Sequence, residues 1–297
     1  MTDSNSPVPW TEEQWVRVRQ VIQEEASRAR VGATFLPLYG PLPPDTDFVP
    51  PEVISYPPKN NLDWMAIQDT TTVPVPTLQV KVFVRGAQMA DPELTSVLQL
   101  FRRAANVLAR LEDALIFRGQ NAPKQNVPNE VAGGADKLPK IWEILGGGKS
   151  NGLLPEGSKP AASDVTGNEL VEMVSGSITE LEDKGHFGPF ATVLGHQFFT
   201  AAQTPNTGSL VLPQDRIIPF LGGGPLLRTS TLFERSGVVV ALGGSPVDLV
   251  VATDVSLNFL QVTTDPMFVF RVFEKVVLRI KEPDAIVALG ESKTAPK

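Results

Sequence analysis

The chain has 297 residues, of which 42% are hydrophobic and 20% charged, and it carries a formal net charge of −7. These proportions are typical of a globular protein with a sizeable core, whereas the acidic balance argues against a surface that coats nucleic acid, which needs clustered lysine and arginine. The absence of cysteine excludes disulfides, thiolate nucleophiles and cysteine-based metal sites.

No targeting or membrane segment is recognisable in the sequence. The first residues, MTDSNSPVPW, lack the basic and apolar regions of a signal peptide, and no apolar run reaches the roughly 18 residues that a membrane span needs. We therefore expect a cytoplasmic protein that does not enter a membrane.

Residues 11–30 are predicted to form an amphipathic helix. Thr11 suits the N-cap position, and two glutamates follow in the first turn, where negative charge complements the helix dipole. An apolar stripe at helical spacing consists of Trp15, Val18, Ile22 and Ala26. Such a stripe most often docks a helix onto the protein's own core and more rarely holds a partner.

Residues 40–76 differ in character from the segments around them. The stretch GPLPPDTDFVPPEVISYPP holds too many prolines for a helix or a central strand. The later stretch DWMAIQDTTTVPVPTLQVKVFV is rich in β-branched residues and predicts the two strands of a long hairpin. The unpaired backbone groups of such an arm need a partner, which is typical of subunits that interlock.

A long helix is predicted to follow this arm. Asp91 suits its N-cap, Pro92 its first helical position and Gly119 its end. One face is apolar at helical spacing, and it consists of Leu94, Leu98, Phe101, Ala105, Leu108 and Leu115.

Residues 120–160 are rich in Gly, Pro, Asn and Lys and predict a surface loop. The sequence GGGKS inside it invites comparison with a phosphate-binding loop, which needs G-x-x-x-x-G-K-[ST] between a strand and a helix. The position of the first glycine is occupied by Glu143, and Leu153-Leu154-Pro155 does not open a helix. We therefore expect no nucleotide site there.

A second amphipathic helix is predicted over residues 164–184, capped by Asp164 or Thr166 and ended by Gly185. The chain beyond it is mostly β, with strands expected at PFATVL, GVVVAL, VDLVVA and FVFRVFEKVVLRIK. In the last strand, alternation separates an apolar face from a cationic one. These faces hold Phe268, Phe270, Val272, Val276, Leu278 and Ile280 on one side and Arg271, Lys275, Arg279 and Lys281 on the other.

Both histidines of the chain lie in GHFGPFATVLGH, as His186 and His196. The glycines and the proline around His186 indicate a turn, and His196 lies just past the strand. A strand of about six residues is roughly 20 Å long, which is too far for shared catalysis. The sequence also lacks H-E-x-x-H, E-x-x-H and G-x-S-x-G, so we expect no catalytic residues and no metal site.

Several stretches, taken together and in order, point to one protein family. They are TEEQW, the pattern VG-x-x-F-x-x-x-x-GP from Val31 to Pro41, EDALIFRG from Glu112 to Gly119, GHFGPFATVL, GGGPLLRTSTLFERSGVVVALGG, VDLVVATDVSLNFL and FRVFEKVVLRIKEPDAIVAL. This ordered set resembles encapsulin shell proteins. The resemblance covers most of the chain, and no single motif carries it.

The resemblance implies an α+β chain with the HK97-like phage capsid fold, in which a peripheral domain, an axial domain and an extended E-loop build an icosahedral shell of identical subunits. The E-loop would pair with a neighbouring subunit. The expected divisions are residues 1–42 (N-terminal helix and start of the peripheral domain), 43–83 (E-loop), 84–137 (peripheral domain with its spine helix), 138–228 (axial domain) and 229–297 (C-terminal strands and tail of the peripheral domain).

In this family the shell encloses cargo enzymes that carry a short C-terminal targeting peptide. By resemblance, the peptide would lie in a groove between the N-terminal helix and strands of the peripheral domain, and the cargo would serve iron storage or defence against oxidative stress. The groove residues carried over are Trp15, Ile22, Ala33, Phe35, Leu36, Pro37, Asp254, Val255 and Leu257.

The sequence departs from the family pattern in three places. Ala33 and Pro37 stand where many members have Arg and Asp, which favours a more apolar or differently sequenced tag. The tryptophan-bearing segment before the spine helix, against which some members place a flavin, is missing, so we expect no cofactor. The stretch Gln120–Asn151 is longer than usual and predicts a surface loop.

A loop that would line the fivefold pore is placed by the family resemblance at Thr204, Pro205, Asn206, Thr207, Gly208 and Ser209. Its small, neutral residues predict a pore without strong charge selection, and a plain surface turn is the alternative. For the whole protein, two other functions remain open. A phage or prophage major capsid protein would share the fold, and a soluble enzyme or protease would need a catalytic constellation that the sequence does not show.

Overall fold

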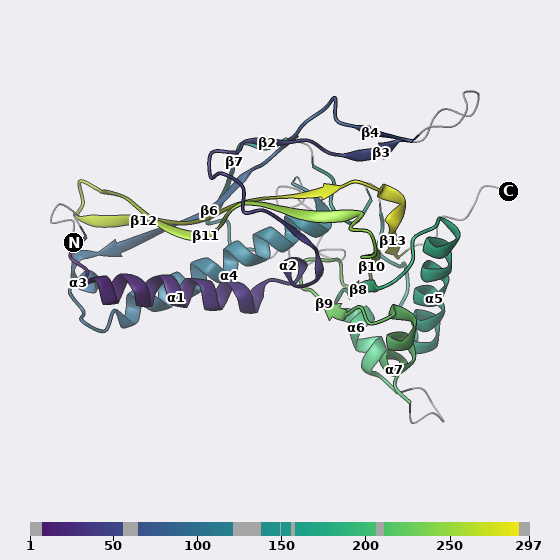
Figure 1. Ribbon diagram of the computed structural model, residues 1–297. Helices are drawn as coiled ribbons and strands as arrows, with labels where there is room; N and C mark the ends of the chain where they lie inside the picture. Colours follow the sequence, from purple (N-terminus) through teal and green to yellow (C-terminus); the bar gives the residue numbers. More distant parts are fainter. Residues whose placement is uncertain are drawn as a thin grey trace.

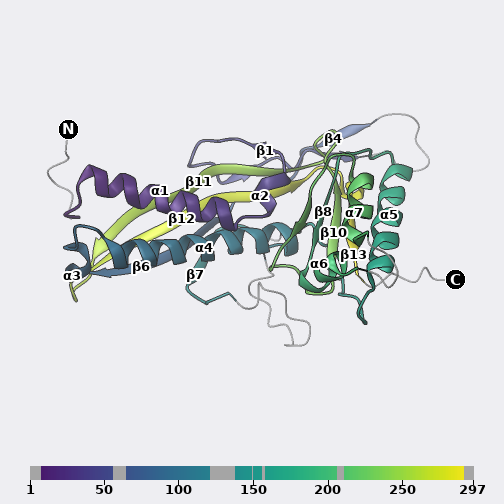
Figure 2. The same ribbon diagram turned by 90° about the horizontal axis from the view of Figure 1, so that it is seen from below.

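The protein combines helices and sheets, as predicted. The computed structural model describes residues 8–55, 65–120, 138–148, 150–155, 158–205 and 211–290. A long, twisted sheet carries two helices on one face and an extended arm on the other, and a smaller sheet with its own helices adjoins one end (Figure 1). Seen from below, helices α1 and α4 lie side by side across the long sheet (Figure 2).

The larger sheet has the strand order β1-β11-β12-β6-β7. Strand β1 runs parallel to β11, and every other neighbouring pair is antiparallel. The two longest strands, β11 and β12, form its centre and correspond to the last two predicted strands. The bounds are β1 Leu38–Tyr39, β6 Thr77–Arg85, β7 Trp142–Leu145, β11 Val247–Val262 and β12 Met267–Ile280.

The first predicted helix is confirmed as α1, Glu12–Ala29. Thr11 is its N-cap and accepts a hydrogen bond from the backbone N–H of Gln14, whose side chain returns a contact to the backbone of Thr11. The predicted stripe faces the core, where Val18, Ile22 and Ala26 are buried. A short helix, α2, Gly32–Phe35, follows at the end of α1.

The long helix, α4, spans Thr95–Arg118, so the predicted start at Pro92 was wrong. The residues before it form a turn in which Leu94 adopts a φ of +51°. Asp91 still stabilises the start of the helix, because its carboxylate oxygens accept hydrogen bonds from the backbone N–H groups of Glu93 and Thr95, each at 3.0 Å. Gly119 ends the helix as predicted, with a φ of +80°. A one-turn helix, α3, Gly86–Met89, precedes this turn.

Aromatic side chains fill the space between the helices and the sheet. The ring of Phe270, on β12, stacks on Trp10 at 5.0 Å between centroids. It also meets the edge of Phe101 from α4 at 5.5 Å and Trp15 from α1 at 6.2 Å. Burial of these large rings, together with the aliphatic side chains of the same core, holds both helices on the sheet.

The arm consists of two short antiparallel ribbons. Its strands are β2 Phe48–Val49, β3 Val53–Ser55, β4 Ala66–Gln68 and β5 Val73–Pro74, with β2 paired to β5 and β3 to β4. We expected both strands of the hairpin between residues 63 and 84. The first strand of each ribbon, β2 or β3, instead comes from the proline-rich stretch. Its prolines lie between these strands of two and three residues, and so they do not interrupt the pairing. Residues 56–64 lie outside the described residues.

The base of the arm is tied to the cationic face of β12. Arg279, only 2% exposed, binds Asp248 on β11 through two hydrogen bonds of 2.9 and 2.7 Å and pairs with Glu52 of the arm at 3.1 Å. Lys275 pairs with Asp47 at 2.7 Å. One face of β12 thus holds the two helices, and the opposite face holds the arm.

The smaller sheet has the order β13-β10-β8-β9. Thr166 is the N-cap of the adjoining helix α5, so of the two caps that we considered, Thr166 is the one observed. The two histidines lie at opposite ends of β8, as predicted, with His186 in the turn before it and His196 at the start of α6. The bounds are α5 Gly167–Asp183, β8 Phe190–Leu194, α6 His196–Gln203, α7 Pro213–Ile217, β9 Leu226–Arg228, β10 Gly237–Ala241 and β13 Ile286–Leu289.

The stretch predicted as a surface loop contains a strand. Residues 142–145 form β7, which pairs with the first residues of β6 and ends the large sheet. The buried side chain of Gln120 stabilises the turn that follows β7. It donates a hydrogen bond to the carbonyl oxygen of Gly146 and accepts one from the N–H of Gly148. The sequence WEIL was too short to stand out among the glycines and prolines around it, and residues 121–137 lie outside the described residues.

Among the described residues, no helix is both long and apolar enough to cross a bilayer.

Arg279→Met should destabilise the protein, because it leaves the buried carboxylate of Asp248 with only Lys281 at 3.2 Å. Removing one partner of a buried pair costs about 3–5 kcal/mol, and we expect the lower end of this range. Chemical unfolding monitored by fluorescence measures the loss. The double variant R279M/D248N should recover much of it; an equal loss in both variants would contradict the role of this pair.

Candidate functional site

The two histidines lie at opposite ends of β8 and do not come together. His186 is half-buried in its turn, and His196 is exposed. Among the described residues, no group of three or more His, Asp or Glu side chains is arranged to hold a metal ion. Two pockets among the described residues lie beside α1 and β11, and we call them together the groove along α1 and β11.

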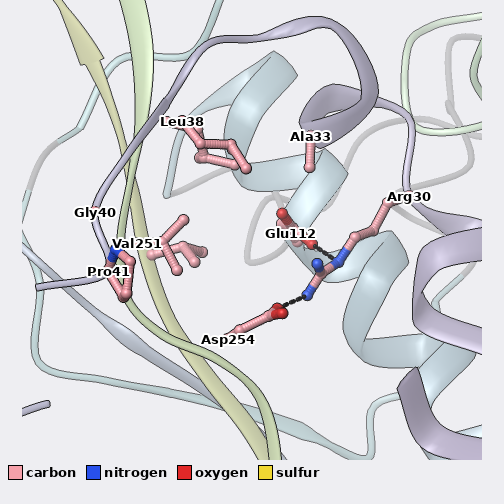
Figure 3. A pocket seen from close by; sticks show the side chains of 10 residues that line it. Arg30, Ala33, Leu38, Gly40, Pro41, Glu112, Val251 and Asp254 are labelled. Carbon is pink, nitrogen blue, oxygen red and sulfur yellow. Dashed lines mark hydrogen bonds and ion pairs between the residues drawn. The ribbon is translucent and has the colours of Figure 1, made fainter. Parts of the chain in front are cut away.

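Two hollows make up this groove. The first, which we call the Arg30 pocket, has a volume of about 250 Å³ (Figure 3). It is lined by Arg30, Ala33, Leu38, Gly40, Pro41, Glu112, Leu249, Val251, Asp254 and Val276. The second, the Leu257 pocket, has a volume of about 210 Å³ and is lined by Arg19, Ile22, Gln23, Val255, Ser256, Leu257 and Asn258.

Neighbouring residues of β11 line the two pockets, Asp254 the Arg30 pocket and Val255 the Leu257 pocket. Here the pairing of β11 with β12 is irregular, with register shifts between Val251 and Ser256. The irregularity turns Asp254 outward, and 67% of its side chain is exposed. A bulge of this kind re-aims a side chain at the edge of a regular strand, so Asp254 places an exposed carboxylate at the Arg30 pocket.

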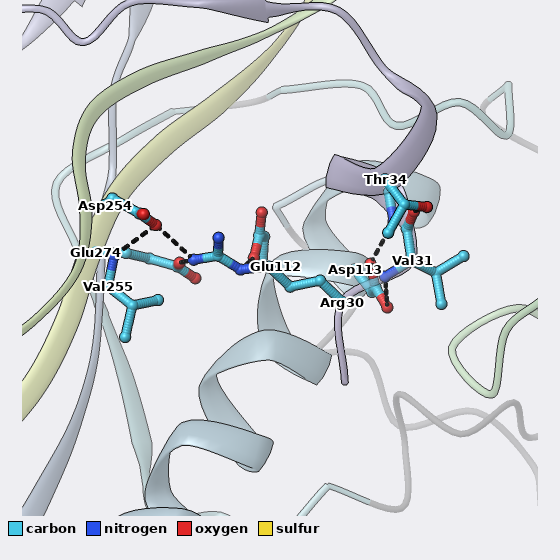
Figure 4. Close-up of polar contacts among 9 residues, drawn as sticks. Arg30, Val31, Thr34, Glu112, Asp113, Asp254, Val255 and Glu274 are labelled. Carbon is cyan, nitrogen blue, oxygen red and sulfur yellow. Dashed lines mark hydrogen bonds and ion pairs between the residues drawn. The ribbon is translucent and has the colours of Figure 1, made fainter. Parts of the chain in front are cut away.

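A cluster of charges forms one wall of the Arg30 pocket (Figure 4). Arg30 follows the last residue of α1, and its Nε lies 2.7 Å from an Oε of Glu112 on α4. Its Nη2 lies 2.8 Å from both Asp254 and Glu274. The side chains of Glu112 and Glu274 are 1% and 0% exposed. One guanidinium therefore joins a helix end, a second helix and both central strands.

Next to this cluster, Asp113 fixes the corner between α1 and α2. Its carboxylate accepts hydrogen bonds from the N–H groups of Val31 at 3.0 Å and Gly32 at 2.8 Å. A Cβ atom at Gly32 would lie 2.5 Å from Cδ1 of Ile116 on α4, so glycine allows the close approach. The corner positions Ala33 at the pocket.

Burial changes the acidity of these groups. Desolvation raises the pKa of Glu274 to about 7 against the opposing effect of Arg30, and it raises the pKa of Asp113 to about 7 against its backbone hydrogen bonds. Burial and the nearby Glu274 raise the pKa of Glu112 well above its usual value. Burial acts to lower the pKa of Arg30, but the three carboxylates outweigh it and the pKa is raised. The cluster thus resists holding all its negative charges at once.

The groove residues named in the sequence fall into two groups. Ile22, Ala33, Asp254, Val255 and Leu257 line the two pockets. The other four pack elsewhere in the protein. Phe35 lies buried 6.4 Å from the ring of Phe117, Leu36 is buried, Trp15 packs on Trp10 at 4.9 Å, and the carbonyl oxygen of Pro37 accepts from Leu249.

Sequence reasoning missed Arg30, Glu112 and Glu274. Glu274 falls among the apolar positions of its strand, and Glu112 lies in the buried part of α4. A charge inside an apolar pattern was the available signal, since buried charges need partners. At the predicted pore loop, Thr204 and Pro205 are exposed after α6, while Asn206, Thr207, Gly208 and Ser209 lie outside the described residues.

Comparisons with known proteins agree on one family. The family model Linocin_M18, described as encapsulating protein for peroxidase, matches residues 4–126 and 141–277. The type 1 encapsulin shell protein EncA of Myxococcus xanthus is 27% identical over 95% of this chain and 93% of its own length.

Solved structures agree with this result at the level of the fold. A virus-like particle from Pyrococcus furiosus superposes with a TM-score of 0.67 at 18% identity, covering 93% of this chain and 99% of that one. The capsid of Myoviridae phage XM1 superposes with a TM-score of 0.50 at 14% identity, covering 80% and 82%. The predicted HK97-like phage capsid fold is thereby confirmed.

Glu274→Gln should change how stability depends on pH. A carboxyl whose pKa rises on folding, here from 4.5 to about 7, binds more protons in the folded state, so its contribution to stability falls as pH increases across that interval. The Tm of E274Q relative to the unaltered protein should therefore rise between about pH 5 and pH 8. Calorimetry over this range measures it.

The matched control is Glu143→Gln. Hydrogen bonds from Lys81 and Gln79 lower the pKa of this exposed glutamate, so its ionised form favours the folded state and the relative Tm of the variant should not rise with pH. A Tm difference for E274Q that stays constant with pH would contradict the assigned shift.

Proposed function

Because this chain belongs to the Linocin_M18 family of encapsulating proteins and is an encapsulin shell protein that forms a capsid-like nanocompartment, we propose that its shell encloses cargo enzymes. A short peptide on each cargo protein occupies the groove along α1 and β11. The shell protein contributes containment and no catalysis of its own. The phage capsid alternative shares the fold, but the matching family model and the Myxococcus relative are encapsulating and shell proteins.

The observation that carries this proposal is the pair of pockets that are lined by the neighbouring residues Asp254 and Val255 of β11. Five residues carried over from the family resemblance line them, from both sides of the groove. Two hollows on one strand suit an extended peptide, because its side chains can enter both while its backbone follows β11. Volumes of about 250 and 210 Å³ accommodate single side chains and not a folded partner.

The parts of the structure correspond to the parts of a capsid subunit in our proposal. The larger sheet with α1 and α4 is the peripheral domain, the β2–β5 arm is the E-loop, and the smaller sheet with α5, α6 and α7 belongs to the axial domain. Strands β10 and β13 fall in the range 229–297 that we expected to be peripheral, yet they pair within the smaller sheet. We therefore count them with the axial domain.

The arm binds a neighbouring subunit. Three of its apolar side chains, Phe48, Met65 and Ile67, are 62%, 72% and 65% exposed. Its outer ribbon consists of two strands, β3 and β4, and the N–H of Ile54 on β3 donates to the carbonyl oxygen of Lys281 at 3.1 Å. Exposed apolar groups are features that subunit contacts cover.

The family's description as encapsulating protein for peroxidase supports a proposal for the cargo class. We propose a cargo enzyme that serves oxidative-stress defence or iron storage. Its small substrates pass through a pore lined by the neutral loop Thr204–Ser209, where small polar side chains impose little charge selection.

Ala33→Trp tests the groove. The indole should fill the Arg30 pocket and prevent a cargo side chain from burying there, a loss of about 1.5–3 kcal/mol, or roughly 10- to 150-fold in affinity. Thr34→Trp is the matched control, since Thr34 lies beside Ala33 on α2 but outside the pocket lining. Both variants are co-expressed with a peroxidase cargo, the class that the family description names, and cargo per shell is measured by gel densitometry and electron microscopy.

We expect intact shells from both variants, with cargo depleted only in A33W. Equal loading of the two variants would contradict the proposed groove.

Ile67→Asp tests the arm. A charge placed on β4 should weaken the contact with a neighbouring subunit and lower the yield of closed shells, while the chain itself stays folded because Ile67 is 65% exposed. Val16→Asp on α1 is the control, at a side chain that is 52% exposed and remote from the arm. Light scattering measures assembly and circular dichroism measures folding. Full assembly of I67D would exclude this residue from the contact.

A further inference from the structure

The exposed side of α4 carries positive charges and no negative ones. The two acidic residues of this helix, Glu112 and Asp113, are buried, with only 1% and 2% of their surface exposed. Arg102 and Arg103 are exposed and Arg110 is half-buried, and we call these three residues the arginine face. The formal net charge of the chain is −7, so a helix surface without a carboxylate is an exception to the acidic balance of the whole chain.

Two residues of the arginine face have no carboxylate partner in the described part of the chain. Neither Arg102 nor Arg103 forms an ion pair with another described residue. On the adjacent helix α1, by contrast, Nη1 of Arg17 lies 2.9 Å from an Oε atom of Glu93. An arginine without such a partner can bind a carboxylate of another molecule without first breaking an internal ion pair.

Arg103 and Arg110 form a row along the helix. They are seven positions apart, so their side chains leave the same side of α4, two turns and about 10 Å apart along its axis. Burial and then the positive charge of Arg103 lower the pKa of Arg110, and Asp113 opposes them. The two guanidinium groups therefore repel each other, and an anion bound along the row would relieve this repulsion.

The arginine face lies on the side of the molecule that meets the cargo in our proposal. Helices α1 and α4 lie side by side on one face of the larger sheet, and the arm lies on the other (Figures 1 and 2). The groove proposed for the cargo peptide borders α1 through Arg19, Ile22 and Gln23. A cargo enzyme held by its peptide in this groove would therefore be close to α4.

We propose that the arginine face binds an acidic segment of the cargo enzyme, as a second contact outside the groove. The inference rests on the proposed enclosure of cargo and goes beyond the contact of its targeting peptide. Carboxylates seven positions apart on a helix, or three apart in an extended segment, have the spacing of about 10 Å that separates Arg103 from Arg110. Each guanidinium can bind such a carboxylate through two parallel hydrogen bonds.

A short acidic segment fits this surface better than a nucleic acid does. Three arginines neutralise few phosphates, and the affinity for nucleic acid increases with the number of phosphates that are neutralised. The net charge of −7 also repels a long polyanion. A few carboxylates on a cargo protein, by contrast, can contact the arginine face alone.

Co-encapsulation of a charged probe tests the proposal. A fluorescent protein with an oligoglutamate tail is co-expressed with the full-length shell protein, and a second probe carries a neutral Gly/Ser tail of equal length. Shells are purified, and fluorescence per shell is measured. We expect about fivefold more of the acidic probe, since two or three exposed ion pairs together contribute a factor of this order. Equal enclosure of the two probes would overturn the proposal.

Charge reversal locates the contact. The double variant R102E/R103E should abolish the preference for the acidic probe. The matched control R85E/K159E makes the same change of charge at two exposed residues outside α4 and should keep the preference. Light scattering checks that each variant forms closed shells. If R102E/R103E disturbs assembly, R102Q/R103Q removes the charges more gently and should still abolish the preference. Equal effects of the changes on α4 and outside it would overturn the proposal.

Two further measurements on the same shells separate this proposal from its alternatives. Absorbance after nuclease treatment measures enclosed nucleic acid. Nucleic acid that unaltered shells retain and R102E/R103E shells lose, without a preference between the probes, would overturn the acidic segment in favour of a nucleic acid. Loading of a peroxidase cargo tests the proposed function separately. Normal peroxidase loading without a preference between the probes would overturn the arginine face alone, and intact shells without peroxidase would overturn the cargo groove.

Discussion

Burial of β12 on both faces is the constraint on which the rest of the structure depends. Its apolar face receives α1 and α4, with Phe270 at the centre of the aromatic cluster. Its other face is covered by the base of the arm, where Val277 packs with Val49 and Val75. A strand covered twice cannot shift its register by one residue without exchanging these two sets of side chains.

Charges on β12 add specificity to this packing. Adjacent residues serve opposite faces, since Glu274 binds Arg30 at the end of α1 while Lys275 binds Asp47 in the arm. Buried ion pairs contribute little net stability because desolvation opposes them. A wrong partner, however, would leave a buried charge unpaired, which is strongly unfavourable. The pairs therefore fix how the helix end and the arm sit relative to one strand more than they strengthen the fold.

Local signals allowed much of the fold to be predicted. The Thr11 and Thr166 caps, the strand β8 and the alternation in β12 each depend on residues close together in sequence. The start of α4 was misplaced because Asp91 caps through a turn, which its spacing alone does not distinguish from an ordinary N-cap. The outgoing strands of the arm were missed because their pairing is with residues across the hairpin, and isolated two- and three-residue strands have no pattern of their own.

In the candidate groove, too, the sequence predicted residues that short motifs identify and missed contacts between residues far apart in the chain. Ile22 and Val255 could be named from a resemblance between short motifs. The cluster around Arg30 instead requires the end of α1 to contact α4, 82 positions away in the sequence, and β12, 244 positions away. The floor of the groove is consequently made of the same buried strands that hold the core, and its shape is set before any ligand arrives. For the proposed cargo peptide, a preformed site would leave ordering of the peptide as the main entropic cost of binding, because the protein would spend no binding energy on rearranging itself.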